Sequence, residues 1–336
     1  MRIYQHTDLL PVFRKAVITI GTFDGVHTGH AQILRQLKRE ADRIDGETVI
    51  VTFYPHPRKI VRGGTEEIRM INTLSEKIEL LAWQQVDHLV IVPFTEAFSQ
   101  LTAEQYIKDF LLEKFRPHTV IIGYDHRFGK GRLGDYHLLE QFSQSEGFEL
   151  QEIPVHLLNA VSVSSTRIRE AIGNADIDTA RLLLGYDFFF SGRVVEGNKL
   201  GRVLGYPTAN LRMENAEKLI PGDGIYAVEA ELIDDPATGS ANAAPPAGHA
   251  VTTASRSLFA GPHLKGMMSI GVRPTIGGGD RTIEVNLFDF NEDIYGRELR
   301  VFVKAWLRPE VKFDGLEALK TQLAIDKVES LNALNS

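Results

Sequence analysis

The sequence of 336 residues contains no cysteine. This absence excludes disulfide bonds and thiolate metal sites, and it suits a reducing compartment. The chain also lacks any run close to the roughly 20 apolar residues that a membrane-spanning helix needs. The N-terminal segment MRIYQHTDLLPVFRK has no continuous apolar stretch of the kind found in secretory signals. We therefore expect a cytoplasmic protein that does not associate with membranes.

An excess of basic residues is missing as well. Lysine and arginine together number 37 against 44 aspartate and glutamate residues, and the formal net charge is -7. General nucleic-acid binders normally carry a basic face, so no nucleic-acid partner is expected. The apolar share is 43%. With this length, it favours two domains, each with a sizeable core of its own.

The first half of the chain alternates between two kinds of pattern. Short β-branched runs predict buried strands at 16–20, 48–54, 87–94 and 118–124. Between them, 31–44 carries a single apolar stripe, and 102–115 opens with Thr102 and Gln105 in a capping-box pattern. This alternation predicts a parallel sheet with helices on both faces. Ligands of such sheets bind at the carboxyl ends of the strands.

The pattern changes near residue 185. Segments 164–172 and 176–184 predict two short helices. After them come β-rich segments, several separated by glycine-containing turns: 188–197, 224–233, 264–272, 281–290 and 297–307. Such a series indicates an antiparallel barrel or sandwich, and 314–331 predicts a closing helix. We therefore expect a first domain at 1–185 and a second at 186–336.

One segment, 234–263, differs from its surroundings in composition. It is rich in Ala, Gly, Ser, Pro and Thr and falls between two strand patterns. Such a segment cannot bury a face of its own, so it predicts a long, mobile surface excursion. His249 and His263 lie within it, and we assign neither of them a role.

The stretch GTFDGVHTGH, residues 21–30, stands where a strand ends and a helix begins. A helix start presents unpaired N–H groups and the positive end of the dipole, which together favour a phosphate. Glycines allow close approach of a ligand, and the imidazoles of His27 and His30 can donate hydrogen bonds or carry charge. A capping histidine beside a surface histidine is the structural alternative. Two histidines among glycines favour phosphate chemistry over it, and over a metal site.

With Phe23, Asp24 and Gly25, this stretch resembles the FMN adenylyltransferase module of bacterial bifunctional riboflavin kinase/FAD synthetases, which carries the H-x-G-H signature of nucleotidyltransferases. Further segments resemble the family in its order: VTFYPHP (51–57), GYDHRFGKGRLGD (123–135) and SSTRIR (164–169). One departure is His126, where the family usually has Phe. The resemblance implies transfer of AMP from ATP to FMN. The FMN phosphate is the nucleophile and pyrophosphate leaves.

The resemblance assigns phosphate-handling roles to particular residues of the first domain. In the loop, the residues implied to hold ATP are Gly21, Phe23, Asp24, Gly25, Gly29, His27 and His30, the two histidines being catalytic. Ser164, Ser165 and Thr166 would donate to phosphate oxygens at a second helix start. Arg169 would neutralise the departing pyrophosphate. Taken without the family, SSTRIR is also an ordinary helix cap followed by a solvated basic turn.

Flavin contacts in this domain are implied for His56, Asp125 and Phe128. His56 lies between Pro55 and Pro57, and a purely structural rigid turn explains that pattern as well. Asp125 either contacts the ligand or caps its own loop.

The second half carries the stretch GNKLGRVLGYPTANL (197–211), which resembles the riboflavin kinase motif. The residues implied to hold ATP are Gly197, Gly201, Gly205 and Pro207, through a loop whose backbone N–H groups wrap phosphates. Thr208 and Asn210 lie two residues apart in an extended segment, so their side chains face the same way. Both offer oxygen ligands suited to Mg²⁺ beside phosphates. An ordinary turn into a strand is the alternative for this stretch.

The segment 281–296 resembles the family's segment around its catalytic glutamate. Period-two alternation sets Glu284 on the face opposite the apolar residues. The implied role of Glu284 is that of the base that takes a proton from the attacking ribityl hydroxyl. Arg308 opens RPEVKF (308–313), which resembles the kinase segment that covers the flavin. Ser269 departs from the family, which usually has Asn there.

The resemblance covers nearly the whole chain through at least six ordered motifs. It implies a Rossmann-like α/β nucleotidyltransferase domain, then an antiparallel six-stranded β-barrel riboflavin kinase domain with a C-terminal helix. The implied activity makes FMN and then FAD from riboflavin and two ATP, with Mg²⁺. One alternative is adenylyl or cytidylyl transfer to another phosphorylated acceptor. The other is a flavin-binding or regulatory protein that has lost catalysis.

Overall fold

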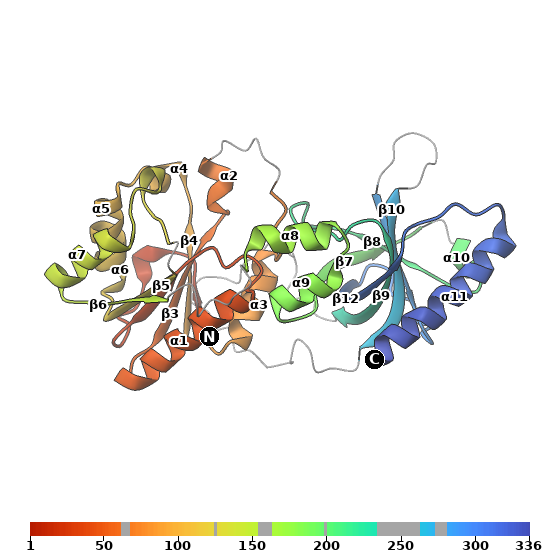
Figure 1. Ribbon diagram of the computed structural model, residues 1–336, viewed down its shortest axis with the longest axis horizontal. Helices are drawn as coiled ribbons and strands as arrows, with labels where there is room; N and C mark the ends of the chain where they lie inside the picture. Colours follow the sequence, from red (N-terminus) through yellow and green to blue (C-terminus); the bar gives the residue numbers. More distant parts are fainter. Residues whose placement is uncertain (62–67, 124–125, 154–162, 198–199, 234–262, 273–280) are drawn as a thin grey trace. The chain divides into compact units, whose positions relative to one another are not determined.

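The computed structural model describes residues 1–61, 68–123, 126–153, 163–197, 200–233, 263–272 and 281–336 (Figure 1). Its contacts divide the chain into two compact units. The described residues up to Ser164, apart from Arg69–Thr73, form the first unit. Arg69–Thr73 and the described residues from Ser165 onward form the second.

A six-stranded sheet is the centre of the first unit. Its strands are β1 (Arg2–Tyr4), β2 (Val17–Ile20), β3 (Thr48–Tyr54), β4 (His88–Pro93), β5 (Thr119–Gly123) and β6 (Glu149–Ile153). They are hydrogen-bonded in the order β1-β4-β3-β2-β5-β6, and every pairing is parallel. The predicted parallel sheet is therefore confirmed, and β1 and β6 add two edge strands that the sequence patterns did not reveal.

The order of the strands reverses at β2. From there the chain adds β3 and β4 on one side and, later, β5 and β6 on the other. The carboxyl ends of β2 and β5 thus mark a topological switch point, the place where doubly wound sheets bind ligands. Residues 21–27 leave β2 at this edge and lead into α1 (Thr28–Ile44).

Helices cover the sheet and close its core. They are η1 (Thr7–Leu9), α1, α2 (Pro57–Val61), α3 (Leu74–Trp83), α4 (Glu96–Ser99), α5 (Ala103–Gln105), η2 (Tyr106–Leu112), α6 (Glu113–Phe115), η3 (Lys130–Arg132) and α7 (Tyr136–Glu146). The capping box of Thr102 and Gln105 is confirmed, with both of its hydrogen bonds present. The helix it starts passes through a π-helical segment, η2, whose Ile107 and Leu111 are buried in the same core as Val49 and Val120.

The second unit is a closed barrel. Its strands are β7 (Phe189–Val195), β8 (Ala209–Arg212), β9 (Gly224–Ile233), β10 (Leu264–Val272), β11 (Arg281–Leu287) and β12 (Glu298–Arg308). They close in the order β10-β11-β8-β7-β12-β9, with antiparallel pairings throughout. Of the two predicted architectures, the barrel is correct. The described helices of this unit are α8 (Ser165–Gly173), α9 (Ile177–Leu184), α10 (Leu200–Val203) and α11 (Leu316–Asn335), and α11 packs against β9, β10 and β12.

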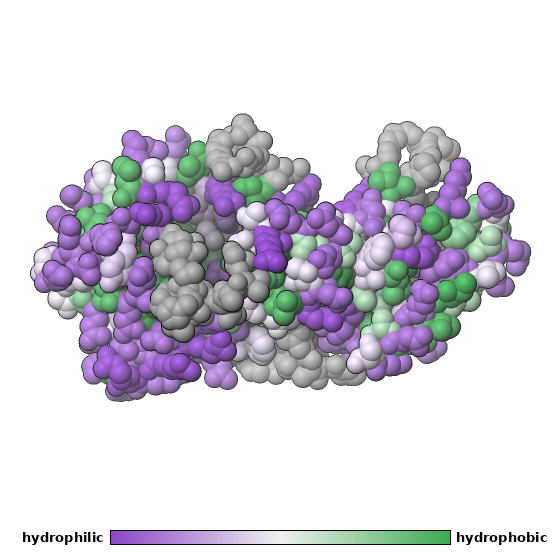
Figure 2. All heavy atoms as spheres, viewed as in Figure 1, coloured by the Kyte–Doolittle hydropathy of each residue, from purple (hydrophilic) through white to green (hydrophobic). Residues whose placement is uncertain are grey.

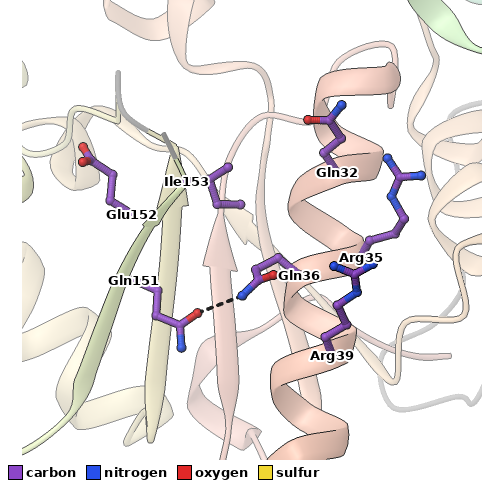
Figure 3. A pocket seen from close by; sticks show the side chains of 7 residues that line it. All are labelled: Gln32, Arg35, Gln36, Arg39, Gln151, Glu152 and Ile153. Carbon is purple, nitrogen blue, oxygen red and sulfur yellow. Dashed lines mark hydrogen bonds between the residues drawn. The ribbon is translucent and has the colours of Figure 1, made fainter. Parts of the chain in front are cut away.

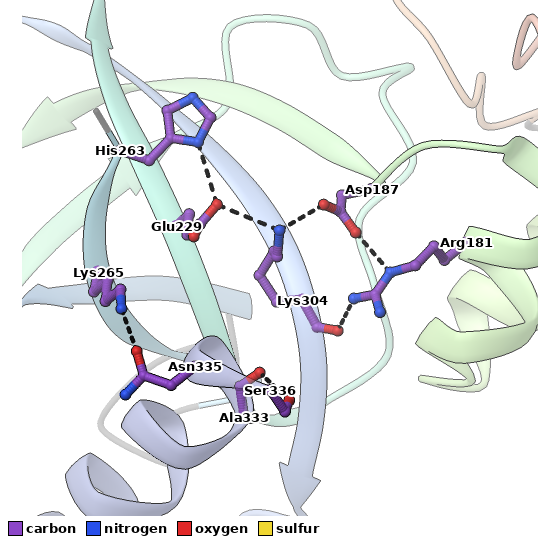
Figure 4. Close-up of polar contacts among 9 residues, drawn as sticks. All are labelled: Arg181, Asp187, Glu229, His263, Lys265, Lys304, Ala333, Asn335 and Ser336. Atoms are coloured by element: carbon purple, nitrogen blue, oxygen red, sulfur yellow. Dashed lines mark hydrogen bonds and ion pairs between the residues drawn. The ribbon is translucent and has the colours of Figure 1, made fainter. Parts of the chain in front are cut away.

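A network of charged side chains ties α9 to the barrel (Figure 4). Lys304 Nζ lies 2.7 Å from Asp187 Oδ2 and 3.3 Å from Glu229 Oε2. Arg181 Nε donates to Asp187 Oδ1 at 2.6 Å. His263 Nδ1 lies 3.2 Å from Glu229 Oε2. The network therefore joins α9, β9, β12 and the residue that precedes β10.

The predicted excursion 234–263 falls outside the described residues except for its last residue. His263, to which we assigned no role from the sequence, stacks its ring on Phe302 with 4.6 Å between the centroids and joins the charged network. None of the helices in the described ranges combines the length and the apolar character that crossing a bilayer requires. The face drawn in Figure 2 is mostly hydrophilic, with apolar residues scattered over it.

Candidate active sites

The loop after β2 brings His27 and His30 together at the start of α1. His27 is the N-cap residue, and its Nδ1 accepts a hydrogen bond from the backbone N–H of His30 at 3.3 Å. The two rings stack with 3.7 Å between centroids and 15° between planes. Since Nδ1 of His27 is an acceptor, the neutral ring carries its proton on Nε2, and that atom is a donor.

Burial decides the charge of this histidine pair. His27 is 7% exposed, and desolvation lowers its pKa to about 4. Desolvation, followed by the charges of His27 and Lys77, lowers the pKa of His30 well below its ordinary value. Both rings are therefore neutral near pH 7. Of the two possibilities that the sequence left open, hydrogen-bond donation and positive charge, the structure favours donation in the free protein.

The pair also contains an unsatisfied polar atom. Among the described residues, Nδ1 of His30 is a buried nitrogen without a hydrogen-bond partner. Buried polar atoms are nearly always paired, and leaving one unpaired costs free energy. The His30 ring also contacts the Phe23 ring, with 4.9 Å between ring centroids. An oxygen-rich ligand at this edge of the sheet would satisfy the nitrogen.

The remaining loop residues explain why this stretch is rich in glycine. A Cβ on Gly29 would stand 3.2 Å from Nδ1 of His27, so a side chain there would crowd the stacked rings. Gly25 has φ +90°, which L-residues rarely adopt. Gly21 directly follows β2, and a Cβ there would stand 3.1 Å from the Phe23 ring. Asp24 is fully buried. The seven predicted loop residues therefore all lie at the switch point.

Sequence reasoning missed Lys77. This residue is 5% exposed on α3, and its Nζ donates to the Thr22 carbonyl at 2.8 Å, inside the candidate site. The available signal was its position: Lys77 falls three residues after Leu74 and four before Leu81, on the apolar face of the helix. A lysine on such a face needs a partner when it is buried.

The predicted residues of SSTRIR lie at the start of α8. Ser165 is the first helical residue, with Ser164 directly before it and Thr166 in the first turn. Ser164 is counted with the first unit, whereas α8 belongs to the second. Arg169 Nε donates to the Arg69 carbonyl at 2.8 Å, also in the second unit.

The predicted flavin residues of the first unit lie in different surroundings. His56 follows β3, and its Nδ1 accepts from the Arg58 backbone N–H at 3.2 Å. Phe128 is 5% exposed and stacks on Tyr106 at 5.0 Å between centroids, within the aromatic core. Asp125 lies outside the described residues.

A cavity of about 320 Å³ lies between α1 and the edge strand β6 (Figure 3). Four side chains of α1 and three of β6 line it: Gln32, Arg35, Gln36, Arg39, Gln151, Glu152 and Ile153. Gln36 Nε2 bridges the two elements by donating to Gln151 Oε1 at 3.2 Å. None of these lining residues was predicted as a site residue.

In the barrel, three predicted residues converge: Asn210 on β8, Thr208 directly before that strand, and Glu284 on β11. Asn210 on β8 and Glu284 on β11 are directly opposed in the antiparallel register. Thr208 Oγ1 donates to Glu284 Oε2 at 3.1 Å. Asn286 lies two residues after Glu284. Its Nδ2 donates to the Pro207 carbonyl at 2.7 Å and so holds the turn that precedes β8. Hydroxyl, amide and carboxylate oxygens therefore gather on one patch.

Two glycines of the predicted loop, Gly197 and Gly201, lie against residues of this patch. A Cβ on Gly197 would stand 2.2 Å from the side chain of Asn210. A Cβ on Gly201 would stand 2.3 Å from the Tyr206 carbonyl and 3.4 Å from Thr208 Oγ1. A side chain at Gly201 would therefore require the backbone of Tyr206 to shift, whereas one at Gly197 would displace the Asn210 side chain. Gly205 turns the chain with φ +84°.

Ser269 lies close to this patch, and Arg308 lies at the end of β12. Ser269, the departure from the family pattern, is opposite Glu284 on the other side of β11, and its Oγ donates to Glu310 Oε1 at 2.9 Å. Arg308 donates to Asp326 on α11 through Nε at 2.7 Å and Nη2 at 2.6 Å. The Arg308 guanidinium, which was predicted to contact flavin, thus forms a bidentate ion pair with Asp326.

Comparisons with known proteins find a separate match for each half of the chain. A family model described as FAD synthetase matches residues 10–167, and one described as riboflavin kinase matches residues 184–334. The chain is 34% identical over 313 residues to the bifunctional riboflavin kinase/FMN adenylyltransferase of Escherichia coli K12, covering 93% of this chain and 90% of the relative. It is 34% identical to that of Haemophilus influenzae over 322 residues, covering 96% and 95%.

The two matches define a tandem of a nucleotidyltransferase domain and a flavokinase domain. The chain belongs to the family of bifunctional riboflavin kinase/FMN adenylyltransferases. A solved structure described as a macrolide-efflux protein from Streptococcus pneumoniae is similar over 98% of both chains, with a TM-score of 0.80 and 27% identity. The architecture is therefore shared with a protein described by another activity, and that description applies to that protein alone.

Proposed function

We propose that the chain phosphorylates riboflavin with ATP to give FMN and then adenylylates FMN with a second ATP to give FAD and pyrophosphate. The observation that carries this proposal is the presence of both family matches in one chain, in the same tandem as in relatives that share more than nine-tenths of its length. We assign adenylyl transfer to the domain at 1–185 and phosphorylation to that at 186–336, and we place the enzyme in the cytoplasm.

Phosphorylation uses the patch around Glu284. Its carboxylate takes the proton of a ribityl hydroxyl of riboflavin while that oxygen attacks the γ-phosphorus of ATP, and the bond to ADP breaks. Thr208 supports this role because its hydrogen bond fixes the orientation of the carboxylate. The glycine loop at 197–205 supplies backbone N–H groups for the ATP phosphates.

The residues on this patch fit a magnesium ion. Thr208 and Asn210 offer neutral oxygen atoms beside the Glu284 carboxylate. Mg²⁺ is typically held by few protein oxygens together with water and substrate phosphates. When bound, the ion neutralises phosphate charge. The protein's own contribution is to hold the hydroxyl and amide oxygens in place through β8 and its pairing with β11.

Adenylyl transfer uses the switch point of the parallel sheet. An oxygen of the FMN phosphate attacks the α-phosphorus of ATP, and the bond to pyrophosphate breaks. No protein nucleophile is needed, so catalysis rests on positioning and on donors aimed at the developing charge. His27 and His30 are such donors, supported by the start of α1. The family resemblance assigns contacts to phosphate to Ser164, Ser165, Thr166 and Arg169 as well.

The test is a direct assay of the chain with purified substrates. Riboflavin with Mg-ATP is expected to give FMN first and FAD later, resolved by chromatography, and EDTA is expected to stop both steps. FMN supplied with Mg-ATP should give FAD and pyrophosphate in equal amounts. FMN formation without FAD would indicate a different acceptor for the first domain. Flavin binding without either product would indicate a protein that has lost catalysis.

A further inference from the structure

A buried lysine lies beside the histidine pair and has no part in the chemistry described so far. Lys77 on α3 is 5% exposed, and burial lowers its pKa while the nearby Asp24 charge opposes that shift. Lysine is among the residues least often buried, because desolvating its ammonium group is costly. A fold that keeps a lysine here must gain something from it.

The contact that Lys77 makes lies in the catalytic loop itself. Its Nζ donates to the carbonyl of Thr22 at 2.8 Å. The same carbonyl accepts from Thr52 Oγ1, on β3, at 3.2 Å. The loop is thereby held from two sides, by a helix and by a neighbouring strand, at the second residue after β2.

The loop needs such support because its backbone is strained. Phe23 has φ +48°, Gly25 has φ +90° and Val26 has φ +34°. Positive φ is unfavourable for bulky and β-branched residues. Strained residues of this kind persist only where their surroundings hold them, and they gather at functional sites. Val26 directly precedes His27, so the strained segment sets where the stacked rings lie.

We propose that Lys77 is a positioning residue of the adenylyl-transfer site, which fixes the strained Thr22–Val26 loop through the Thr22 carbonyl and thereby holds His27 and His30 in line for the ATP phosphates. This inference rests on the proposed function of the first domain. Lys77 is not itself placed in contact with substrate. Its effect is exerted through the backbone that carries the two histidines.

The test compares Lys77→Met, Lys77→Arg and Thr52→Val in the full chain, with FMN and Mg-ATP as substrates. Misplacing a catalytic group by about 1 Å costs on the order of 100-fold, so we expect Lys77→Met to lower kcat of FAD formation by about that factor. KM for FMN should change by less than about 3-fold, because the donors act mainly in the transition state. Thr52→Val removes the longer of the two hydrogen bonds to the Thr22 carbonyl. It should lower kcat of FAD formation by about 5-fold, within the range of one net hydrogen bond.

Rescue separates positioning from loss of fold. Lys77→Arg keeps a charged donor on a long side chain, and it should recover at least about 10-fold of the activity lost in Lys77→Met. All assays are run at a temperature where circular dichroism shows each variant fully folded. Riboflavin phosphorylation by the same chains serves as an internal control, and it should stay within about 2-fold of the parent.

The chain offers a matched control in Lys218. This lysine is 2% exposed, and its Nζ donates to the Ile71 carbonyl at 2.6 Å, within the second unit. Lys218→Met therefore removes a hydrogen bond from a similarly buried lysine to a carbonyl that is not part of the catalytic loop. It is expected to lower thermal stability without a selective fall in FAD formation.

The outcomes distinguish a failure of the proposed function from a failure of the inference about Lys77. A parent chain that makes no FAD from FMN would overturn the proposed function and this inference with it. A parent that makes FAD, beside a folded Lys77→Met variant of equal kcat, would overturn the inference alone. A folded variant that loses both activities equally, or one whose loss Lys218→Met reproduces, would also overturn it, because the effect would then be general destabilisation.

Discussion

Thr208 Oγ1 donates a 3.1 Å hydrogen bond to Oε2 of Glu284, across the pairing of β8 with β11 in the barrel. Two residues 76 positions apart in the sequence are thus locked in one orientation by the register of the strands. Because the bond fixes the rotation of the carboxylate, the proton-accepting lone pairs have a defined direction. A substrate hydroxyl that lies along this direction can pass its proton to Glu284.

Glu284→Gln is therefore expected to lose most riboflavin phosphorylation. The amide keeps the size of the carboxylate but is not basic, and the loss of a general base typically costs about 100-fold or more. FAD formation from supplied FMN should be almost unchanged, since it belongs to the other domain. The two rates are measured separately on one preparation. A variant with full kinase rate would show that Glu284 is not the base.

Thr208→Val tests the orientation of that carboxylate. Valine matches threonine in shape but cannot donate to Glu284, and it removes one candidate magnesium oxygen. We expect riboflavin phosphorylation to fall by at least about 10-fold, with a higher Mg²⁺ concentration needed for half-maximal rate. Titrating Mg²⁺ against the initial rate checks this. An unchanged magnesium dependence would remove Thr208 from the proposed ligands.

His30→Ala is expected to abolish most FAD formation while riboflavin phosphorylation persists. Removing one preorganised donor typically costs on the order of 100-fold or more. The unpaired Nδ1 of His30 is the physical reason to expect a ligand there. His137, on the surface of α7, offers a control substitution that should leave both rates unchanged. Undiminished FAD synthesis by a folded His30→Ala chain would refute the role.

The parts of the fold that could be predicted are those whose pattern is local. β3 is one example: its first six residues are buried, since helices cover both faces of a parallel sheet, and it therefore appears as a continuous β-branched run. The edge strand β6, ELQEI, buries only its last residue and gives no such signal. Whether the second domain is a barrel or a sandwich depends on the pairing of β9 with β12, whose register no local pattern encodes.

The candidate sites divide in the same way. His27 and His30 could be found from the sequence because a three-residue spacing at the start of a helix is enough to bring their rings together. Lys77 could not, because it reaches Thr22 from 55 positions away in the sequence. Arg308 shows the converse problem: the resemblance assigned it to flavin, whereas its two hydrogen bonds to Asp326 exist only once α11 has packed on the barrel.

Asp326→Ala should destabilise the barrel strongly. Asp326 has a side-chain exposure of 1% and Arg308 one of 17%, so the substitution leaves a guanidinium buried without its partner. Such losses cost about 3 kcal/mol or more of unfolding free energy. Asp42→Ala breaks the exposed pair with Lys38 and should cost about 0.5 kcal/mol or less. Urea unfolding measures both, and equal costs would contradict the importance assigned to burial.

We expect the stability of the chain to depend on pH through His27. Burial lowers the pKa of His27 from its ordinary 6.5 to about 4. Between these values the unfolded chain binds a proton that the folded chain does not, so stability is present above pH 6.5 and is lost as the pH falls towards 4. At pH 5 the loss from this residue amounts to about 2 kcal/mol.

His27→Gln should remove that part of the pH dependence. The sequence has two tryptophans, Trp83 on α3 and Trp306 in the barrel, so a Trp306→Phe background lets fluorescence report the first unit alone. Urea unfolding at pH 7.5 and pH 5 then gives the change in free energy with and without His27. We expect the decrease on acidification to be smaller in the variant by about 2 kcal/mol. Equal decreases in both chains would mean that His27 is not held neutral by burial, and its part in adenylyl transfer would then be that of a cation.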